Sequence, residues 1–247
     1  MPFYIVSILL PLIAIVHLVR TGRDMRWIML IVFLPVVGAL AYFVIEVLPS
    51  LRQSPGARRA LQRARATIDP NRGLREGALD YERSQNVETA SRLADELTKA
   101  GRFDEAIRVC GEARQGVFED DPKILLALAG AQYAAARYAD AIATLDYLRA
   151  KHPTLRISDG HLLYARALEE SGATQRALEE YVALVRYYPG AEARVRQALL
   201  YKKLGERDKS AELLAAILKD ARLAPRHFRR SQAEWIAVAE RENAAIK

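Results

Sequence analysis

The sequence predicts an all-α protein in two parts, a two-helix transmembrane hairpin and then an α-solenoid of paired helices that ends in a C-terminal capping helix. Three observations predict this fold class. Two long segments near the N-terminus carry no charged residue, a six-residue pattern occurs four times between residues 101 and 210, and six of the seven net positive charges lie within residues 1–65. Because these basic residues flank the apolar segments, the composition favours contact with phospholipid headgroups and argues against nucleic-acid binding.

The predicted hairpin has spans at about residues 3–19 and 27–48. The 22 residues from Trp27 to Leu48 would extend about 33 Å as a helix, enough to cross a hydrocarbon core of ~30 Å. Pro35 predicts a kink near residues 31–35, and the short connector at 20–26 closes the hairpin. A cleaved signal peptide is the competing interpretation, but the segment has neither a basic start nor a small-residue cleavage site.

A short basic connector followed by Trp27, Leu34-Pro35, Gly38 and Tyr42 resembles the N-terminal hairpin of bacterial cardiolipin synthases and related phospholipase D-type proteins. The resemblance covers residues 3–48 and implies an anchor in the bacterial inner (plasma) membrane. It does not extend to catalysis, because those enzymes need paired His-x-Lys-x4-Asp motifs. None of the four histidines of this chain is followed by lysine two residues later.

Residues 49–83 are predicted to form a basic juxtamembrane linker that includes one helix, since Pro49–Gly56 is rich in turn-forming residues. The linker carries five arginines just after the second span, against three in the connector. By the positive-inside rule this difference favours a cytoplasmic C-terminal domain. The same arginines are candidate contacts for lipid headgroups, or they serve only to set the topology: Arg52, Arg58, Arg59, Arg63 and Arg65.

The repeated pattern closes on Ala106, Ala141, Ala177 and Ser210, which are 35, 36 and 33 residues apart. This spacing brackets the 34-residue period of tetratricopeptide (TPR) repeats, and residues 84–225 resemble about four of them. Residues 226–247 are predicted to be the capping helix, with Trp235 packed and not available for binding. The whole chain also resembles bacterial proteins that join such a hairpin to TPR repeats.

No arrangement typical of an enzyme, a cofactor or a metal site is present in the sequence. Cys110 is the single cysteine, which excludes an intramolecular disulfide, and its apolar position predicts burial. The pairs Glu169-Glu170 and Glu179-Glu180 are expected to lie on a solvated face. The acidic run at 119–121 is expected to cap the helix that follows it.

The expected function is a membrane-anchored scaffold or adaptor for protein–protein interactions, with envelope assembly or quality control as the roles that suit it. The alternative is an accessory protein of phospholipid metabolism that responds to anionic lipid without catalysis. The expected partners are proteins bound in the concave groove and membrane lipids; partner identity and oligomeric state stay open. The candidate groove residues, which an opposing interpretation treats as ordinary surface, are Asp95, Lys99, Lys123, Tyr133, Arg166, Glu170, Lys202 and Lys203.

Overall fold

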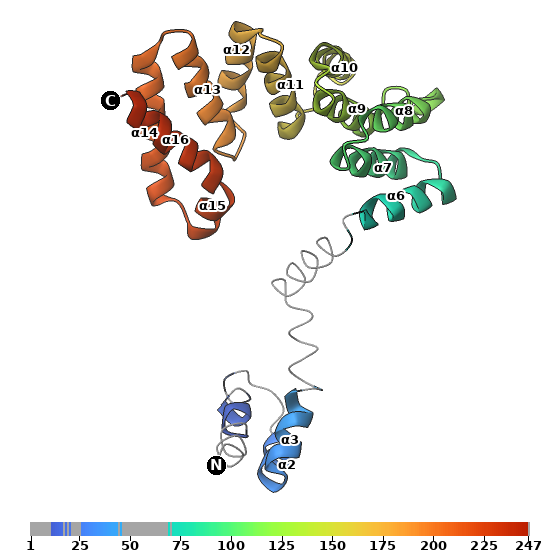
Figure 1. Cartoon of the computed structure of the whole chain (residues 1–247), viewed down its shortest axis with the longest axis vertical. Coiled ribbons are helices and arrows are strands. Elements are labelled where there is room, and N and C mark those ends of the chain that lie inside the picture. The colour runs from blue at the N-terminus through green and yellow to red at the C-terminus, as the bar shows by residue number, and fades with distance from the viewer. Residues whose placement is uncertain are drawn as a thin grey trace. The chain divides into compact units, whose positions relative to one another are not determined.

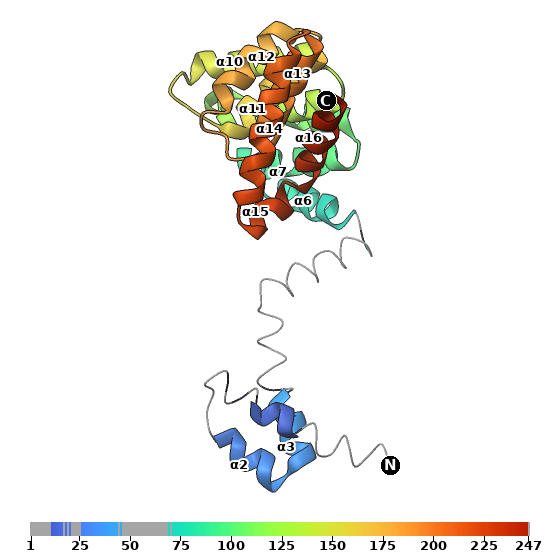
Figure 2. The same ribbon diagram turned by 90° about the vertical axis from the view of Figure 1, so that its left-hand side faces the viewer.

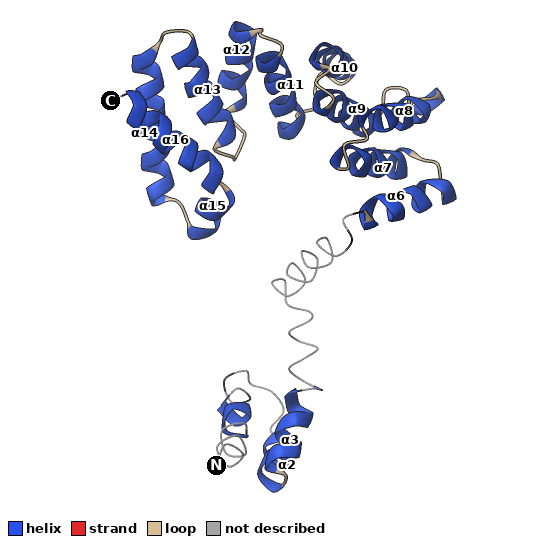
Figure 3. Ribbon diagram, in the orientation of Figure 1, coloured by secondary structure: helices blue, strands red, loops and turns tan. Residues whose placement is uncertain are grey.

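The computed structural model describes residues 11–16, 18, 20, 26–43, 45, 69 and 71–246. Every regular element among these residues is helical, as Figure 3 shows by colour. The chain divides into two compact units, residues 1–72 and residues 73–247, here called unit 1 and unit 2. The all-α class predicted from the sequence is therefore confirmed for the part of the chain that the structure describes.

Unit 1 brings the two apolar segments of the sequence together. Helical residues 11–16 come from the first segment, and α2 (Arg26–Phe33) and α3 (Pro35–Tyr42) come from the second. Ala14 and Leu18 are buried in one cluster with Ile31 and Tyr42. Trp27 packs edge-on against Tyr42, with ring centroids 5.6 Å apart. The two segments thus form a small apolar core of their own.

The second apolar segment bends within residues 31–35, as the sequence predicts, and the bend divides it into the two helices α2 and α3. The bend falls at Leu34, directly before Pro35, whose ring and missing N–H prevent a straight helix from continuing. A Cβ atom on Gly38 would collide with the carbonyl group of Leu30, so only glycine allows this approach of α3 to α2. Within the described ranges, no helix is both long enough and apolar enough to span a bilayer. Residues 3–10, 17, 19, 44 and 46–48 of the predicted spans lie outside those ranges.

Unit 2 is a row of antiparallel helix pairs that follow one another along an arch (Figures 1 and 2). The pairs have the order expected of an α-solenoid, each packing on the next. The first two are α7 (Val87–Lys99) with α8 (Phe103–Ala113), and α9 (Pro122–Ala134) with α10 (Tyr138–Lys151). A 3₁₀ turn, η2 (Gly116–Phe118), lies between them. The next two pairs are α11 (Ser158–Glu170) with α12 (Thr174–Leu184), and α13 (Glu192–Lys203) with α14 (Arg207–Leu223).

The small residues of the sequence pattern lie where the helices of unit 2 meet most closely. The four pattern-closing residues, 106, 141, 177 and 210, are all fully buried. So are the alanines at 94, 129, 165 and 198 in the first helix of each pair. A larger side chain at any of these positions would hold two helix backbones apart. The positions that recur in the sequence are therefore positions of close packing in each of the four helix pairs.

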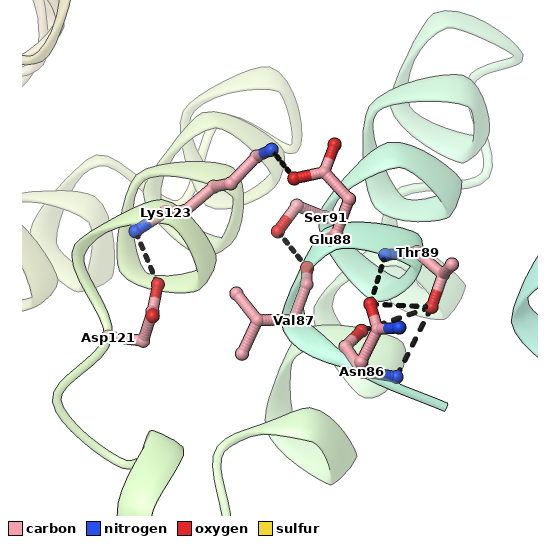
Figure 4. A network of polar contacts seen from close by, with 7 residues as sticks. All are labelled: Asn86, Val87, Glu88, Thr89, Ser91, Asp121 and Lys123. Carbon is pink, nitrogen blue, oxygen red and sulfur yellow. Dashed lines mark hydrogen bonds and ion pairs between the residues drawn. The ribbon is translucent and has the colours of Figure 1, made fainter. Parts of the chain in front are cut away.

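Polar side chains cap the N-termini of α7 and α9, the first helices of the first two pairs. Asn86 forms a capping box with Thr89, whose backbone N–H donates to Asn86 Oδ1 at 2.9 Å (Figure 4). Asp121 accepts from the backbone N–H of Lys123 at 2.8 Å and begins α9, which confirms the capping role expected of the acidic run. Lys123 also pairs with Glu88 of α7, so the starts of α7 and α9 are tied together.

Both ends of the array are covered. At one end α6 (Arg72–Arg83) packs Leu74, Ala78 and Tyr81 against the core of the first pair, so the packed array begins one helix before the predicted boundary at residue 84. At the other end α15 (Arg226–Ser231) leads into α16 (Ala233–Ile246), which packs on α13 and α14. Trp235 belongs to that cluster, as predicted for a capping helix.

Ser210 supplies a test of the repeat pattern, because it is a hydroxyl at a position that is alanine in the other three pairs. Its Oγ is buried and has no hydrogen-bond partner among the residues that the structure describes. We expect Ser210→Ala to raise the free energy of unfolding by about 1 kcal/mol, since an unsatisfied buried hydroxyl is removed. Urea unfolding followed by circular dichroism measures the change. Ser91→Ala is the control, because the equally buried Ser91 hydroxyl donates to the carbonyl of Val87 and its removal should not stabilise the protein.

Candidate functional site

The predicted groove residues of the first two helix pairs lie close together. Asp95, Lys99 and Lys123 interact through their charges, and burial raises the pKa of Asp95 while the two lysines oppose that change. Lys99 is held by Glu96 at 2.6 Å, and Lys123 by Glu88. These three residues therefore form a mixed-charge surface, and both lysines already have an intramolecular partner.

Tyr133 and Arg166 of the predicted groove are in contact with each other. The guanidinium of Arg166 lies 4.8 Å from the centre of the Tyr133 ring, which joins α11 to α9 by a cation–π contact. Arg166 also lies 3.7 Å from Glu192 at the start of α13. Arg166 therefore links three successive first helices of the array, α9, α11 and α13.

The other three predicted groove residues are not brought together. Lys202 donates to Glu242 of α16 at 2.8 Å, so it attaches the capping helix. Glu170 and Lys203 are exposed and make no described contact with the rest of the predicted groove. Whether any of the eight residues binds a partner stays a prediction. The five candidate lipid-contact arginines between 52 and 65 lie outside the described residues.

A pocket that the sequence did not indicate lies among α9, α10, α11 and α12. Its volume is about 640 Å³, and its apolar floor is formed by Leu126, Leu145, Leu148 and Ile157. It opens beside the six-residue loop 152–157, which separates the second helix pair from the third. The volume falls in the range of sites that bind small ligands or peptide side chains.

A polar bridge centred on His161 holds one wall of this pocket. Nε2 of His161 donates to Glu180 Oε2 at 2.6 Å, and the hydroxyl of Tyr187 donates to Nδ1 of the same ring. Arg149 of α10 donates to the other oxygen of Glu180 at 3.0 Å. The bridge therefore joins α10, α11 and α12, and it uses both nitrogens of the histidine and both oxygens of the carboxylate.

The electrostatics of the pocket are positive. Glu180 is the one carboxylate of the His161 bridge, and its charge is balanced by Arg149. Arg156 and Arg186 also line the pocket, are exposed, and have no ion-pair or hydrogen-bond partner on their side chains within the described part of the chain. Burial raises the pKa of the Tyr187 phenol, and the charge of Arg156 opposes this rise. Arg156 therefore acts on the same wall as the His161 bridge.

The bridge makes the free energy of unfolding of the protein depend on pH. The hydrogen bond from His161, followed by that from Arg149, lowers the pKa of Glu180 below its ordinary value of 4.5. A carboxylate with a lowered pKa in the folded state stabilises that state above pH 4.5, and this contribution is lost as the pH falls below 4.5. We expect Glu180→Gln to cost about 1–2 kcal/mol at neutral pH, and less as the pH falls through this window. Urea unfolding at several pH values measures it.

Glu179 provides the matched control for that measurement. It is the neighbouring carboxylate on α12, it is exposed, and no ion pair is described for it. Glu179→Gln should leave the stability of the protein unchanged within about 0.5 kcal/mol across the same pH range. Equal behaviour of the two variants would contradict the role assigned to Glu180.

The single cysteine of the chain lies in the core of unit 2. Cys110 is fully buried, as predicted, and burial raises the pKa of its thiol to about 12, so it stays protonated. No cluster of histidine, cysteine, aspartate and glutamate suited to a metal ion occurs in the ranges that the structure describes.

The sequence did not indicate the polar residues that support the pocket and the neighbouring helix contacts. Glu169 and Glu180 were expected on a solvated face. Their neighbours in sequence, Glu170 and Glu179, are exposed as expected. Glu169 and Glu180 are instead partly buried, and each forms ion pairs with residues of other helices. The available signal was the grouping of His152, Arg156 and His161 in and just after the connection at 152–157.

Comparison with known proteins agrees with the fold. Residues 97–167 match the tetratricopeptide repeat family. No curated protein matches the chain in sequence. The crystal structure of MamA is similar with a TM-score of 0.52 and 19% identity, covering 68% of this chain and 94% of that one. A thermophilic TPR protein of Thermus thermophilus has a TM-score of 0.52 and 18% identity, over 70% of this chain and 88% of its own. These likenesses establish a TPR-like helical solenoid for unit 2.

Proposed function

We propose that the chain is a membrane-anchored adaptor, in which unit 2 binds protein partners and unit 1 attaches them to a bacterial plasma membrane. TPR-type arrays are generally non-catalytic scaffolds that bind proteins on extended surfaces, and unit 2 has that architecture. Attachment would confine the array to the membrane surface and raise its effective concentration toward partners held at the same surface.

Exposed apolar side chains on unit 1 carry the proposal of membrane attachment. Phe33 is 80% exposed and Met29 is 70% exposed, although both belong to the most apolar part of the chain. Val32 and Val37 are similarly exposed, and no charged residue occurs between positions 27 and 45. Several exposed apolar side chains on so short a segment are typical of a membrane or protein contact. We favour the membrane because basic residues flank the segment in sequence on both sides.

The proposal is tested with the full chain and substitutions that place charge on this surface. Phe33→Lys with Val37→Lys should weaken membrane association, because a lysine at the centre of a bilayer costs about 2.5–3.5 kcal/mol. Leu223→Lys is the control, since Leu223 is also 80% exposed but belongs to unit 2. Extraction of membrane fractions with alkaline carbonate separates integral from peripheral protein. Release of the unsubstituted chain by carbonate would contradict anchoring.

The orientation of unit 2 forms part of the same proposal. We place it on the cytoplasmic side, on the strength of the five arginines that follow the second apolar segment. Protease added to right-side-out spheroplasts should then leave unit 2 intact, and permeabilised spheroplasts should lose it. Cleavage in intact spheroplasts would reverse the orientation and direct the search for partners to the envelope.

A further inference from the structure

We propose that the pocket beside loop 152–157, and not only the concave groove, binds a short acidic and apolar segment of a partner protein. An apolar side chain of that segment would enter the floor, and its carboxylates would contact Arg156 and Arg186. The inference rests on the proposed adaptor function and names a partner class for it. The two parts of the pocket, its floor and its rim, supply separate arguments.

The floor is apolar and built into the core of the array. Leu145 and Leu148 of α10 belong to the main core cluster, and Leu126 of α9 packs against that cluster. Leu155 lies in the loop at the pocket's edge and is 45% exposed. An entering apolar side chain would gain contacts with groups already held in place, and would cover Leu155.

The rim selects for negative charge. Arg156 and Arg186 are exposed and have no partner of their own within the described part of the chain, whereas Arg149 is already paired with Glu180. Guanidinium groups present paired N–H donors that fit a carboxylate, so two unpaired arginines beside an apolar floor complement an acidic residue next to an apolar one. A basic partner segment would meet the same arginines with repulsion.

The wall between floor and rim is formed before any ligand arrives. His161, Glu180 and Arg149 join three helices, and the rings of Tyr187 and His161 are 5.8 Å apart. Tyrosine and arginine are also the residue types enriched where protein interfaces gain most of their affinity. A prearranged wall of this composition reduces the ordering that binding requires.

The test uses the full chain in detergent micelles and fluorescence polarisation of labelled ten-residue peptides. The probe set alternates Asp or Glu with Leu or Phe at varied spacing. Matched sets replace the acids by Asn and Gln, or the apolar residues by Ser. At least one acidic and apolar peptide should bind saturably and more than tenfold better than both of its matched peptides. No such preference would overturn the proposal.

Substitutions then locate the binding. Arg156→Ala with Arg186→Ala should weaken the best peptide at least tenfold, and Leu155→Ser should weaken it several-fold. Arg83→Ala with Arg207→Ala removes the same charge from exposed positions elsewhere in unit 2 and should leave binding unchanged. Because Arg156 and Arg186 lack partners within the described residues, their loss should not alter the melting temperature appreciably. Equal weakening by both double variants would mean a general charge effect and would overturn the site.

Two further outcomes separate this proposal from its competitors. Phosphatidylglycerol vesicles that bind the unsubstituted chain through Arg156 and Arg186, while no peptide does, would assign the pocket to lipid and overturn the peptide proposal. Carbonate extraction of the Arg156→Ala and Arg186→Ala variant should match that of the unsubstituted chain. A pocket that fails in the peptide assay while carbonate extraction still shows anchoring would therefore remove only the present inference.

Discussion

Replacing Tyr181 with alanine is expected to lower the free energy of unfolding by about 3–5 kcal/mol, the loss typical of a large aromatic side chain removed from a core. The Tyr181 side chain is fully buried on α12. It belongs to the cluster that also contains Leu168 of α11 and Leu200 of α13, so a cavity there would weaken the contact between the third and fourth helix pairs. Urea unfolding monitored by circular dichroism measures the loss.

Tyr181→Phe separates the packing of the ring from its hydrogen bond. The Tyr181 hydroxyl donates to Glu169 at 2.8 Å, and burial raises the pKa of the phenol. Because Arg196 still contacts Glu169 at 3.0 Å in that variant, we expect phenylalanine to cost only about 1 kcal/mol. If the alanine variant were as stable as the phenylalanine variant, the Tyr181 ring would not contribute to the packing between the third and fourth helix pairs.

The repeat architecture could be predicted because its requirements recur at fixed positions. Each helix pair needs a small residue where it meets its neighbour, and that demand is local to about 34 residues. Ala106, Ala141 and Ala177 show it directly, and all are fully buried. Even the exception, Ser210, is buried in the same place. Trp235 could be assigned to packing for a similar reason, since it lies on one apolar stripe of a terminal helix.

The polar partners could not be predicted in the same way, because they join residues on different helices. His161 and Glu180 are 19 residues apart, and Glu169 and Arg196 are 27 apart. Which of two adjacent glutamates faces a neighbouring helix depends on the rotation of that helix about its axis. A one-residue difference turns a side chain by about 100° on a helix of 3.6 residues per turn. Glu169 and Glu180 therefore lie in networks, and Glu170 and Glu179 lie in solvent.

The second apolar segment shows a different limit. Pro35 was expected to kink a helix, and the bend at Leu34 agrees with that expectation. The degree of the bend depends on how closely the two halves can approach, which is decided by Gly38 against the backbone of Leu30. That contact brings together residues eight apart in sequence, which a continuous helix would hold about 12 Å apart. The periodicity of the sequence does not indicate that α3 packs this closely against α2.

Arg196→Ala is expected to cost about 3 kcal/mol, because it removes the central charge of a partly buried network. Arg196 donates to Glu192 at 2.8 Å and to Glu169 at 3.0 Å, and its guanidinium lies 5.0 Å from the centre of the Trp235 ring. Burial alone would lower the pKa of Arg196, but Tyr181 and the two carboxylates together raise it, so the charge is retained. Loss of the Arg196 side chain would leave the carboxylates of Glu169 and Glu192 less well compensated. It would also weaken the attachment of α16, which carries Trp235.

Arg194 is the matched control on the same helix. It pairs with Asp220 at 2.7 Å, but the Asp220 side chain is 60% exposed, so Arg194→Ala should cost less than about 1 kcal/mol. Comparison of the two alanine variants by urea unfolding isolates the effect of burial from that of charge. Equal losses would mean that the Arg196 network does not attach α16 to the array. A larger loss at Arg196, with earlier proteolysis of α16, would establish that the network attaches the cap to the array.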